Sequence, residues 1–262
     1  SEDVPAAPHR LIEQINDTDK WASWLKGISK KQVEHVNKGL DLVRTIGEMY
    51  TSGEADVEMT GLLFMWSFLS RGVSPFTQEG LFLDMADDAK EFIKIAADGK
   101  WTDAVEKRYL KWADKAMPEV SPGRQSSHNL NAYGESFLRK FSEKGPDGKA
   151  KLQRLHELIA DRSISSTEVR REFFRLIEKP GIDNKVVSFT LLASGREDVV
   201  ILDRIQIRNM FDDGRYGRLN VYDGFKITRP NGKKNVVAGS GFATIMNGVR
   251  GLAIYEAIER AM

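Results

Sequence analysis

Residues 173–203 read FFRLIEKPGIDNKVVSFTLLASGREDVVILD, a pattern that predicts two helices joined by a tight turn. Apolar residues recur at helical spacing as far as Ile177, and Pro180-Gly181 then breaks the helix. A second apolar helix is expected over Val186–Ser194, although its β-branched residues would also suit a strand. A short apolar run precedes Asp203. Such a turn exposes backbone N–H groups at the start of the second helix, where these groups and the helix dipole suit a phosphate oxygen. An ordinary helix–helix turn would give the same pattern.

A lysine and an aspartate stand at defined places around this turn. Lys185 opens the second helix, and Asp203 lies 203 − 185 = 18 residues later. This arrangement resembles the helix-hairpin-helix DNA glycosylase superfamily, whose pattern is Leu-Pro-Gly-Val-Gly-x-Lys, an apolar helix, and an apolar run that ends in Val-Asp. The spacing matches the endonuclease III branch and lies within about one residue of the 8-oxoguanine glycosylase branch. Arg208 also matches an arginine of the endonuclease III pattern.

A second stretch, Gln125-Ser-Ser-His-Asn129, supports the same resemblance. It belongs to a polar segment, residues 121–129, that we expect to form a loop before a helix containing Tyr133 and Phe137. It is similar to the Ser-Ser-Asn-Asn-Asn loop of 8-oxoguanine glycosylases, which fills the hole left by the extruded base. The resemblance therefore implies that His128 or Asn129 is the wedge in the base stack. The alternative is a pair of ordinary polar loop residues.

The chain departs from the family pattern at the turn itself. Asp183 replaces the second hairpin glycine, Lys179 replaces a leucine, and Ile205 replaces a histidine. Aspartate tolerates a left-handed backbone better than most residues, but its charge is unfavourable near a phosphate. The absence of cysteine excludes an iron–sulfur cluster and brings the chain nearer to the 8-oxoguanine type. The residues for which the resemblance implies DNA contact are Gly181, Asp183, Asn184, His128, Asn129 and Arg208.

Lys185 and Asp203 suit the chemistry that the resemblance implies. A neutral amine can attack the sugar C1′, displace the base and form a Schiff base, which then permits strand cleavage by β-elimination. Asp203 can stabilise the developing oxocarbenium charge or transfer protons. A solvated lysine and a helix N-cap are the alternatives. We expect Lys185 and Asp203 to be the catalytic pair of a bifunctional DNA glycosylase.

Three aromatic residues lie in the dense apolar run from Leu62 to Leu69, which predicts a buried helix. Phe64, Trp66 and Phe68 could stack on a flipped base, but packing in the core accounts for them as well. The acidic groups of the chain are typical of solvated helix faces and turns, so we expect no metal and no cofactor. These groups are Asp84, Asp87, Asp88, Asp212 and Asp213.

The remainder of the chain predicts an all-α, two-lobed fold. Residues 1–9 are expected to be a flexible arm, residues 10–120 a helical lobe, and residues 121–218 the helix-hairpin-helix catalytic lobe. Residues 219–262 should contain a short β-hairpin, near 219–236, and a C-terminal helix that packs back on the first lobe. Capping boxes are expected at Ser29–Gln32 and Ser165–Glu168, and Thr102 is expected to cap a helix.

Composition limits the classes of protein that fit. The 39 basic and 38 acidic residues leave a net charge of +1, which excludes a polyelectrolyte tail but leaves DNA binding open. Without cysteine there are no disulfides and no zinc thiolate sites. No apolar run approaches the roughly 20 residues of a membrane span, and the N-terminus lacks the features of a signal peptide. We expect a cytoplasmic (nucleoid) or nuclear monomer, without membrane contact, that acts on double-stranded DNA carrying a lesion or modified base.

Two alternative functions remain open on the same residues. The first is a DNA base-hypermodification enzyme built on this scaffold, as in phage thymine modification, which would not need a Schiff-base lysine. The second is a non-catalytic DNA-binding module, in which Lys185 would be a phosphate contact. The sequence does not identify the base.

Overall fold

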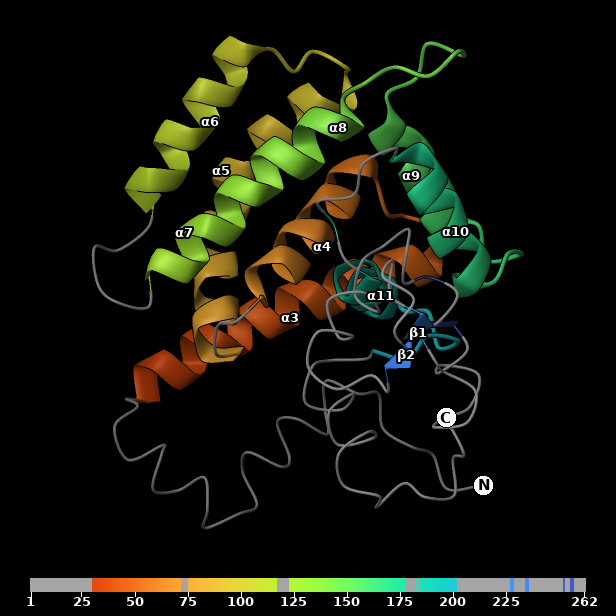
Figure 1. The fold of residues 1–262 in the computed structure, drawn as a ribbon. Helices are drawn as coiled ribbons and strands as arrows, with labels where there is room; N and C mark the ends of the chain where they lie inside the picture. Colours follow the sequence, from red (N-terminus) through yellow and green to blue (C-terminus); the bar gives the residue numbers. More distant parts are fainter. Residues whose placement is uncertain are drawn as a thin grey trace, which may run out of the picture.

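The computed structural model describes residues 30–71, 75–116, 123–177, 182, 184–201, 227–228, 234–235, 252 and 255–256. Helices account for most of these residues, as the all-α prediction requires, and Figure 1 shows their arrangement. The elements are α3 (Lys30–Ser52), α4 (Val57–Leu69), α5 (Pro75–Ala97), α6 (Asp103–Ala116), α7 (Gly123–Ala132), the π-helix η1 (Tyr133–Leu138), α8 (Arg139–Phe141), α9 (Lys151–Ala160), α10 (Ser166–Leu176), α11 (Asn184–Ala193), β1 (Ile227–Thr228) and β2 (Lys234–Asn235).

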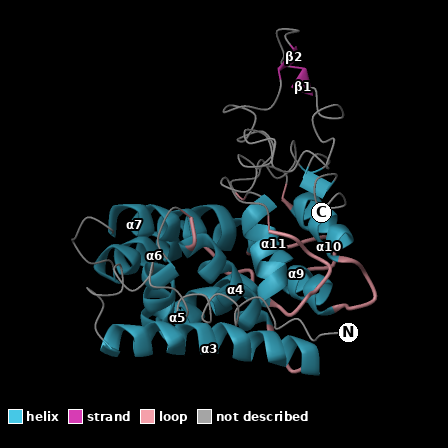
Figure 2. Cartoon of the chain, turned by 90° about the horizontal axis from the view of Figure 1, so that it is seen from below, coloured by secondary structure: helices cyan, strands magenta, loops and turns pink. Residues whose placement is uncertain are grey.

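Helix α4 is the centre of the fold, and its burial was expected from the apolar run in the sequence. Every residue from Thr60 to Leu69 is buried. Asp56 caps the helix by accepting a hydrogen bond of 2.9 Å from the backbone N–H of Met59. Helices α3, α5, α7, α9 and α11 all pack against α4. Figure 1 shows α4 in the middle of the helices, with α6 at one edge and α10 at the other, and Figure 2 shows α3 running along one side.

Phe64 and Phe68 belong to an aromatic core, and the prediction that they line a base pocket is wrong. Both side chains are 0% exposed. The Phe64 ring stacks on Phe137 with 4.4 Å between ring centroids and on Phe173 with 5.4 Å. The Phe68 ring meets the edge of Tyr133. Because aromatic contacts of this kind close the space between α4, η1 and α10, neither ring has a face left for a ligand.

Helix α7 begins at Gly123, so the expected loop over residues 121–129 is wrong from that residue onward. The Tyr109 hydroxyl of α6 holds the helix by donating to the carbonyl of Leu130, and the Tyr133 hydroxyl of η1 donates to the carbonyl of Gly61 in α4. The helix continues into the π-helix η1, where Gly134 lies so close to the Tyr109 ring that a Cβ would be 2.3 Å from it. These tertiary contacts outweigh the low helix propensity of the polar residues.

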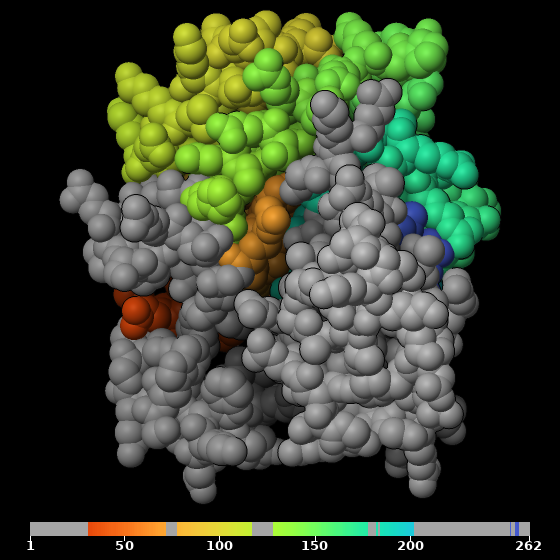
Figure 3. Space-filling view, in the orientation of Figure 1, coloured from red at the N-terminus to blue at the C-terminus, as the bar shows by residue number. Residues whose placement is uncertain are grey.

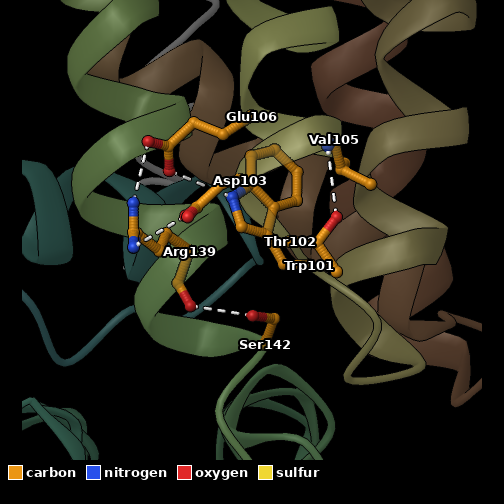
Figure 4. A network of polar contacts seen from close by, with 7 residues as sticks. All are labelled: Trp101, Thr102, Asp103, Val105, Glu106, Arg139 and Ser142. Atoms are coloured by element: carbon orange, nitrogen blue, oxygen red, sulfur yellow. Dashed lines mark hydrogen bonds and ion pairs between the residues drawn. The ribbon is translucent and has the colours of Figure 1, made fainter.

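The first turn of α6 is joined to α8 by a polar network, shown in Figure 4. Thr102 accepts a hydrogen bond of 3.3 Å from the backbone N–H of Val105, which confirms it as the cap of α6. Arg139 forms ion pairs with Glu106 at 2.8 Å and with Asp103 at 3.2 Å. Because Arg139 and Asp103 are exposed, we expect their pair to contribute little to stability.

Helices α9, α10 and α11 meet at a corner organised by Arg196. The Arg196 guanidinium donates hydrogen bonds to backbone carbonyl oxygens at and beyond the end of α9, those of Leu158, Ile159, Asp161 and Ile164. It thereby satisfies acceptors that a helix end leaves without partners. The expected capping box between Ser165 and Glu168 is present at the start of α10.

The described residues near the C-terminus contact α10. The Tyr255 hydroxyl donates to the carbonyl of Val200 at 3.1 Å, and Glu256 pairs with Arg171 through two hydrogen bonds. The Arg170 guanidinium lies over the Tyr255 ring, 4.9 Å from its centroid. These contacts are with the predicted second lobe. Most of the C-terminal helix, for which packing on the first lobe is expected, lies outside the described residues. Strands β1 and β2 pair antiparallel within the segment predicted to contain a hairpin.

The close crossing of α3 and α5 depends on a glycine. A Cβ on Gly39 would lie 2.4 Å from the carbonyl oxygen of Glu79, a backbone atom that cannot move without the helix, whereas a Cβ on Gly80 would lie 3.4 Å from the His35 ring. We expect Gly39→Ala to destabilise the protein by about 1–3 kcal/mol despite the better helix propensity of alanine. The matched substitution Gly80→Ala should be neutral or stabilising by up to about 1 kcal/mol. Urea unfolding of both variants measures this difference, and equal free energies of unfolding would show that the helices do not cross this closely.

Candidate functional site

Lys185 lies in the first turn of α11, one residue after the helix begins, and its side chain is half-buried. Helix α11 packs against α10, and Ile182, between the two helices, is 1% exposed and anchors the connection in the core. The predicted hairpin turn itself lies mostly outside the described residues, so the hairpin stays a prediction. Of the other residues predicted for this site, Gly181, Asp183, Asp203 and Arg208 lie outside the described residues.

Phe189 follows Lys185 by four residues and therefore lies next to it on the same face of α11. The Phe189 ring stacks on Trp66 of α4 with 4.3 Å between centroids and an angle of 20° between the ring planes. On the buried side of α11, the Thr190 hydroxyl donates to the hydroxyl of Ser67 at 2.8 Å. The structure thus brings Trp66 to the Lys185 face of α11, whereas Phe64 and Phe68 point into the aromatic core.

Glu79, near the start of α5, holds the other side of Trp66. The Trp66 indole N–H donates to both carboxylate oxygens of Glu79, each at 2.9 Å. Glu79 is 3% exposed, and within the described part of the chain no lysine or arginine forms an ion pair with it. Burial raises the pKa of the Glu79 carboxyl group to about 7, although the hydrogen bond from Trp66 acts in the opposite direction. This group therefore changes its charge near neutral pH.

Two amide side chains fix the backbone at the end of α4. Gln78 donates to the carbonyl of Trp66 at 3.1 Å, and Asn129 of α7 donates to the carbonyl of Arg71 at 2.7 Å. Figure 3 shows atoms of the α4–α5 region, in orange, set back beneath α7, in green. Gln78 and Asn129 are buried, so both amides serve the interior.

The burial of Asn129 corrects its predicted role as a wedge in the base stack, because a side chain that is 1% exposed and bonded to Arg71 is not presented at the surface. His128 is exposed, and the wedge prediction remains with it. The Asn184 side chain is also fully buried and is therefore not presented to a phosphate.

Sequence reasoning missed Glu79 and Phe189. Glu79 lies three residues before Phe82, on the face of α5 that continues through Ala86 and Ala89 into the core. A carboxyl group at a core position was the available signal. The signal for Phe189 was its spacing of four residues from Lys185.

Neither a protein-family model, nor a curated protein, nor a solved structure matches this chain. None of the described helices is both long enough and apolar enough to cross a membrane. The described residues also contain no group of three or more histidine, aspartate or glutamate side chains placed to hold a metal ion. The candidate site therefore consists of the Lys185 face of α11 together with Phe189, Trp66 and Glu79.

We predict that Glu79→Gln makes the protein more stable at alkaline pH. A group whose pKa is raised from 4.5 to about 7 favours the folded state at low pH, and this contribution is lost as pH rises through 7. Glutamine carries no charge, so at pH 8 the variant should exceed the wild type by about 3 kcal/mol. The difference should shrink towards pH 4.5, the ordinary pKa of a glutamate side chain.

Urea unfolding of both proteins between pH 4.5 and pH 8 measures this difference in the free energy of unfolding. Glu91→Gln is the matched control, because Glu91 is an exposed residue of the same helix. A difference between wild type and Glu79→Gln that does not change with pH would contradict the raised pKa.

Proposed function

We propose that the protein is a DNA glycosylase with lyase activity at abasic sites, which turns a damaged or modified base out of the duplex and cleaves its N-glycosidic bond through Lys185. The observation that supports this proposal best is the position of Lys185. The residue lies in the first turn of α11, after a connection anchored by Ile182, and its side chain is half-buried. The spacing from Lys185 to Asp203 and the turn around Gly181 add the resemblance to helix-hairpin-helix DNA glycosylases.

The proposed reaction uses the neutral amine of Lys185 as the nucleophile. Its nitrogen forms a bond to C1′ of the deoxyribose, the C1′–N bond to the base breaks, and the base leaves with that electron pair and a proton. The bond from C1′ to the ring oxygen then breaks, the ring oxygen takes a proton, and the Schiff base forms. Asp203 would stabilise the positive charge at C1′ and transfer these protons.

The aromatic surface beside Lys185 also supports the proposal. Enzymes that act on a base in duplex DNA first extrude it and hold it by stacking and hydrogen bonds. Phe189 lies on the face of α11 that carries Lys185, and its ring stacks on Trp66 of α4. His128 is exposed and would contact DNA in this proposal.

We expect sodium borohydride to trap a covalent complex between the protein and a duplex that contains an abasic site. Reduction converts the Schiff base into a stable amine, so the complex should be seen by denaturing gel electrophoresis. Lys185→Ala should abolish trapping. Lys94→Ala, which changes an exposed lysine of α5, is the control and should trap as the wild type does. Undiminished trapping by Lys185→Ala would exclude this lysine as the nucleophile.

We expect Asp203→Asn to slow base release by orders of magnitude while the affinity for DNA stays nearly normal. The charge of Asp203 is proposed to stabilise the transition state more than the bound substrate, so its loss should affect rate rather than binding. Single-turnover rates and duplex affinities measure the two effects separately. An equal loss of both would assign Asp203 to the structure.

A further inference from the structure

Glu79 is a buried carboxyl group whose charge the described contacts do not require. Its function in holding Trp66 needs only one acceptor, since a glutamine in the same place could accept the indole N–H through its amide oxygen. Burying a carboxylate without a cationic partner is unfavourable, whereas burying an amide with a hydrogen bond costs far less. The orientation of Trp66 therefore does not account for a carboxyl group at this position.

The carboxylate also retains acceptor capacity. Two carboxylate oxygens offer about four lone-pair positions, and in the described part of the chain Trp66 supplies one N–H, which both oxygens share. The backbone of Glu79 is fixed by its close approach to Gly39. A rigid group with unused acceptors in a desolvated place can discriminate strongly between ligands, because an unmatched partner leaves a buried polar group without its hydrogen bond.

The two neighbours of Trp66, an aromatic ring and a carboxyl group, point to the chemical class of the ligand. A planar ring, that of Phe189, stacks on Trp66 in this structure, and Phe189 is the less buried member of the pair. A nucleobase is a planar ring with N–H groups on its edge. A nucleobase that took the place of Phe189 would stack on the indole ring whose N–H binds Glu79.

We propose that Glu79 recognises the extruded nucleobase by accepting a hydrogen bond from an N–H group on its edge, and so determines which base the site takes. This assignment rests on the proposed function, because it requires a base turned out of the duplex. Glu79→Gln is an informative variant, since it keeps the shape and the acceptor for Trp66 but places an N–H₂ donor where the base N–H would bind.

The test measures affinity for five duplexes that differ at one position, which holds an unpaired adenine, cytosine, guanine or thymine, or an abasic site. Unpaired bases are the least costly to extrude, so base recognition should dominate the differences. The wild-type protein should distinguish the four bases. Glu79→Gln should reduce this discrimination about tenfold, the effect of one lost hydrogen bond in a desolvated site. On the abasic duplex, which offers no base to Glu79, the loss of affinity should be smaller than on the base that the wild-type protein prefers. Glu91→Gln, the same change at an exposed residue of α5, should behave as the wild type.

Three results would overturn the assignment. These are a wild-type protein that binds all four bases equally, a Glu79→Gln variant that keeps the wild-type preference, and a variant that loses affinity for the abasic duplex to the same extent. The last result would give Glu79 a purely structural role. A protein that discriminates between bases but is not trapped on the abasic duplex would retain the Glu79 assignment and lose the Lys185 chemistry, so the two proposals fail in different ways.

Discussion

The burial of α4 is the constraint on which the rest of the described structure depends. A helix that is covered over ten successive residues, Thr60 to Leu69, needs neighbours on every side. Helices α3, α5, α7, α9 and α11 supply them. Segments far apart in sequence therefore meet on this one helix, and residues of α5, α7 and α11 all contact it. The candidate site is a consequence of this convergence.

The surroundings of α4 differ along its two faces. One face carries Phe64 and Phe68 into stacked rings from η1 and α10. The other face carries Trp66, which contacts the carboxyl group of Glu79 and the partly buried ring of Phe189. An apolar core stabilises the fold without specifying a ligand, whereas desolvated polar groups reduce stability and can recognise one. The candidate site lies where the core of the protein becomes polar.

Much of this arrangement could be predicted from the sequence. The dense run from Leu62 to Leu69 predicts a buried helix, and the capping box at Ser165 marks the start of α10. The contrast between Phe64, Trp66 and Phe68 was also available, because residues four apart share a helix face and a residue midway between them points away.

Other features depend on contacts that local patterns do not reveal. Helix α7 begins in a polar segment because Asn129 and Leu130 are held by groups far away in sequence, Arg71 and Tyr109. The partnership of Glu79 with Trp66 likewise joins two helices through side chains alone. Helical periodicity places a residue on a face, but it does not say which element that face will meet. The turn around Gly181 and the aspartate at 203 are still known only from sequence.

Helices α7, η1 and α8 form one continuous helix from Gly123 to Phe141. The π-helix η1 sets how far one end of it is rotated about the helix axis relative to the other end. An α-helix turns by about 100° per residue, whereas a π-helix turns by less. The residues of η1 therefore change the rotation of α7 about the helix axis relative to α8. Phe137 and Phe141 are thereby directed at the aromatic core while Asn129 reaches Arg71. The deletion of one residue within η1 would restore ordinary winding and turn α7 about its own axis, carrying His128 with it. The number of residues in η1 therefore determines the direction in which His128 of α7 faces.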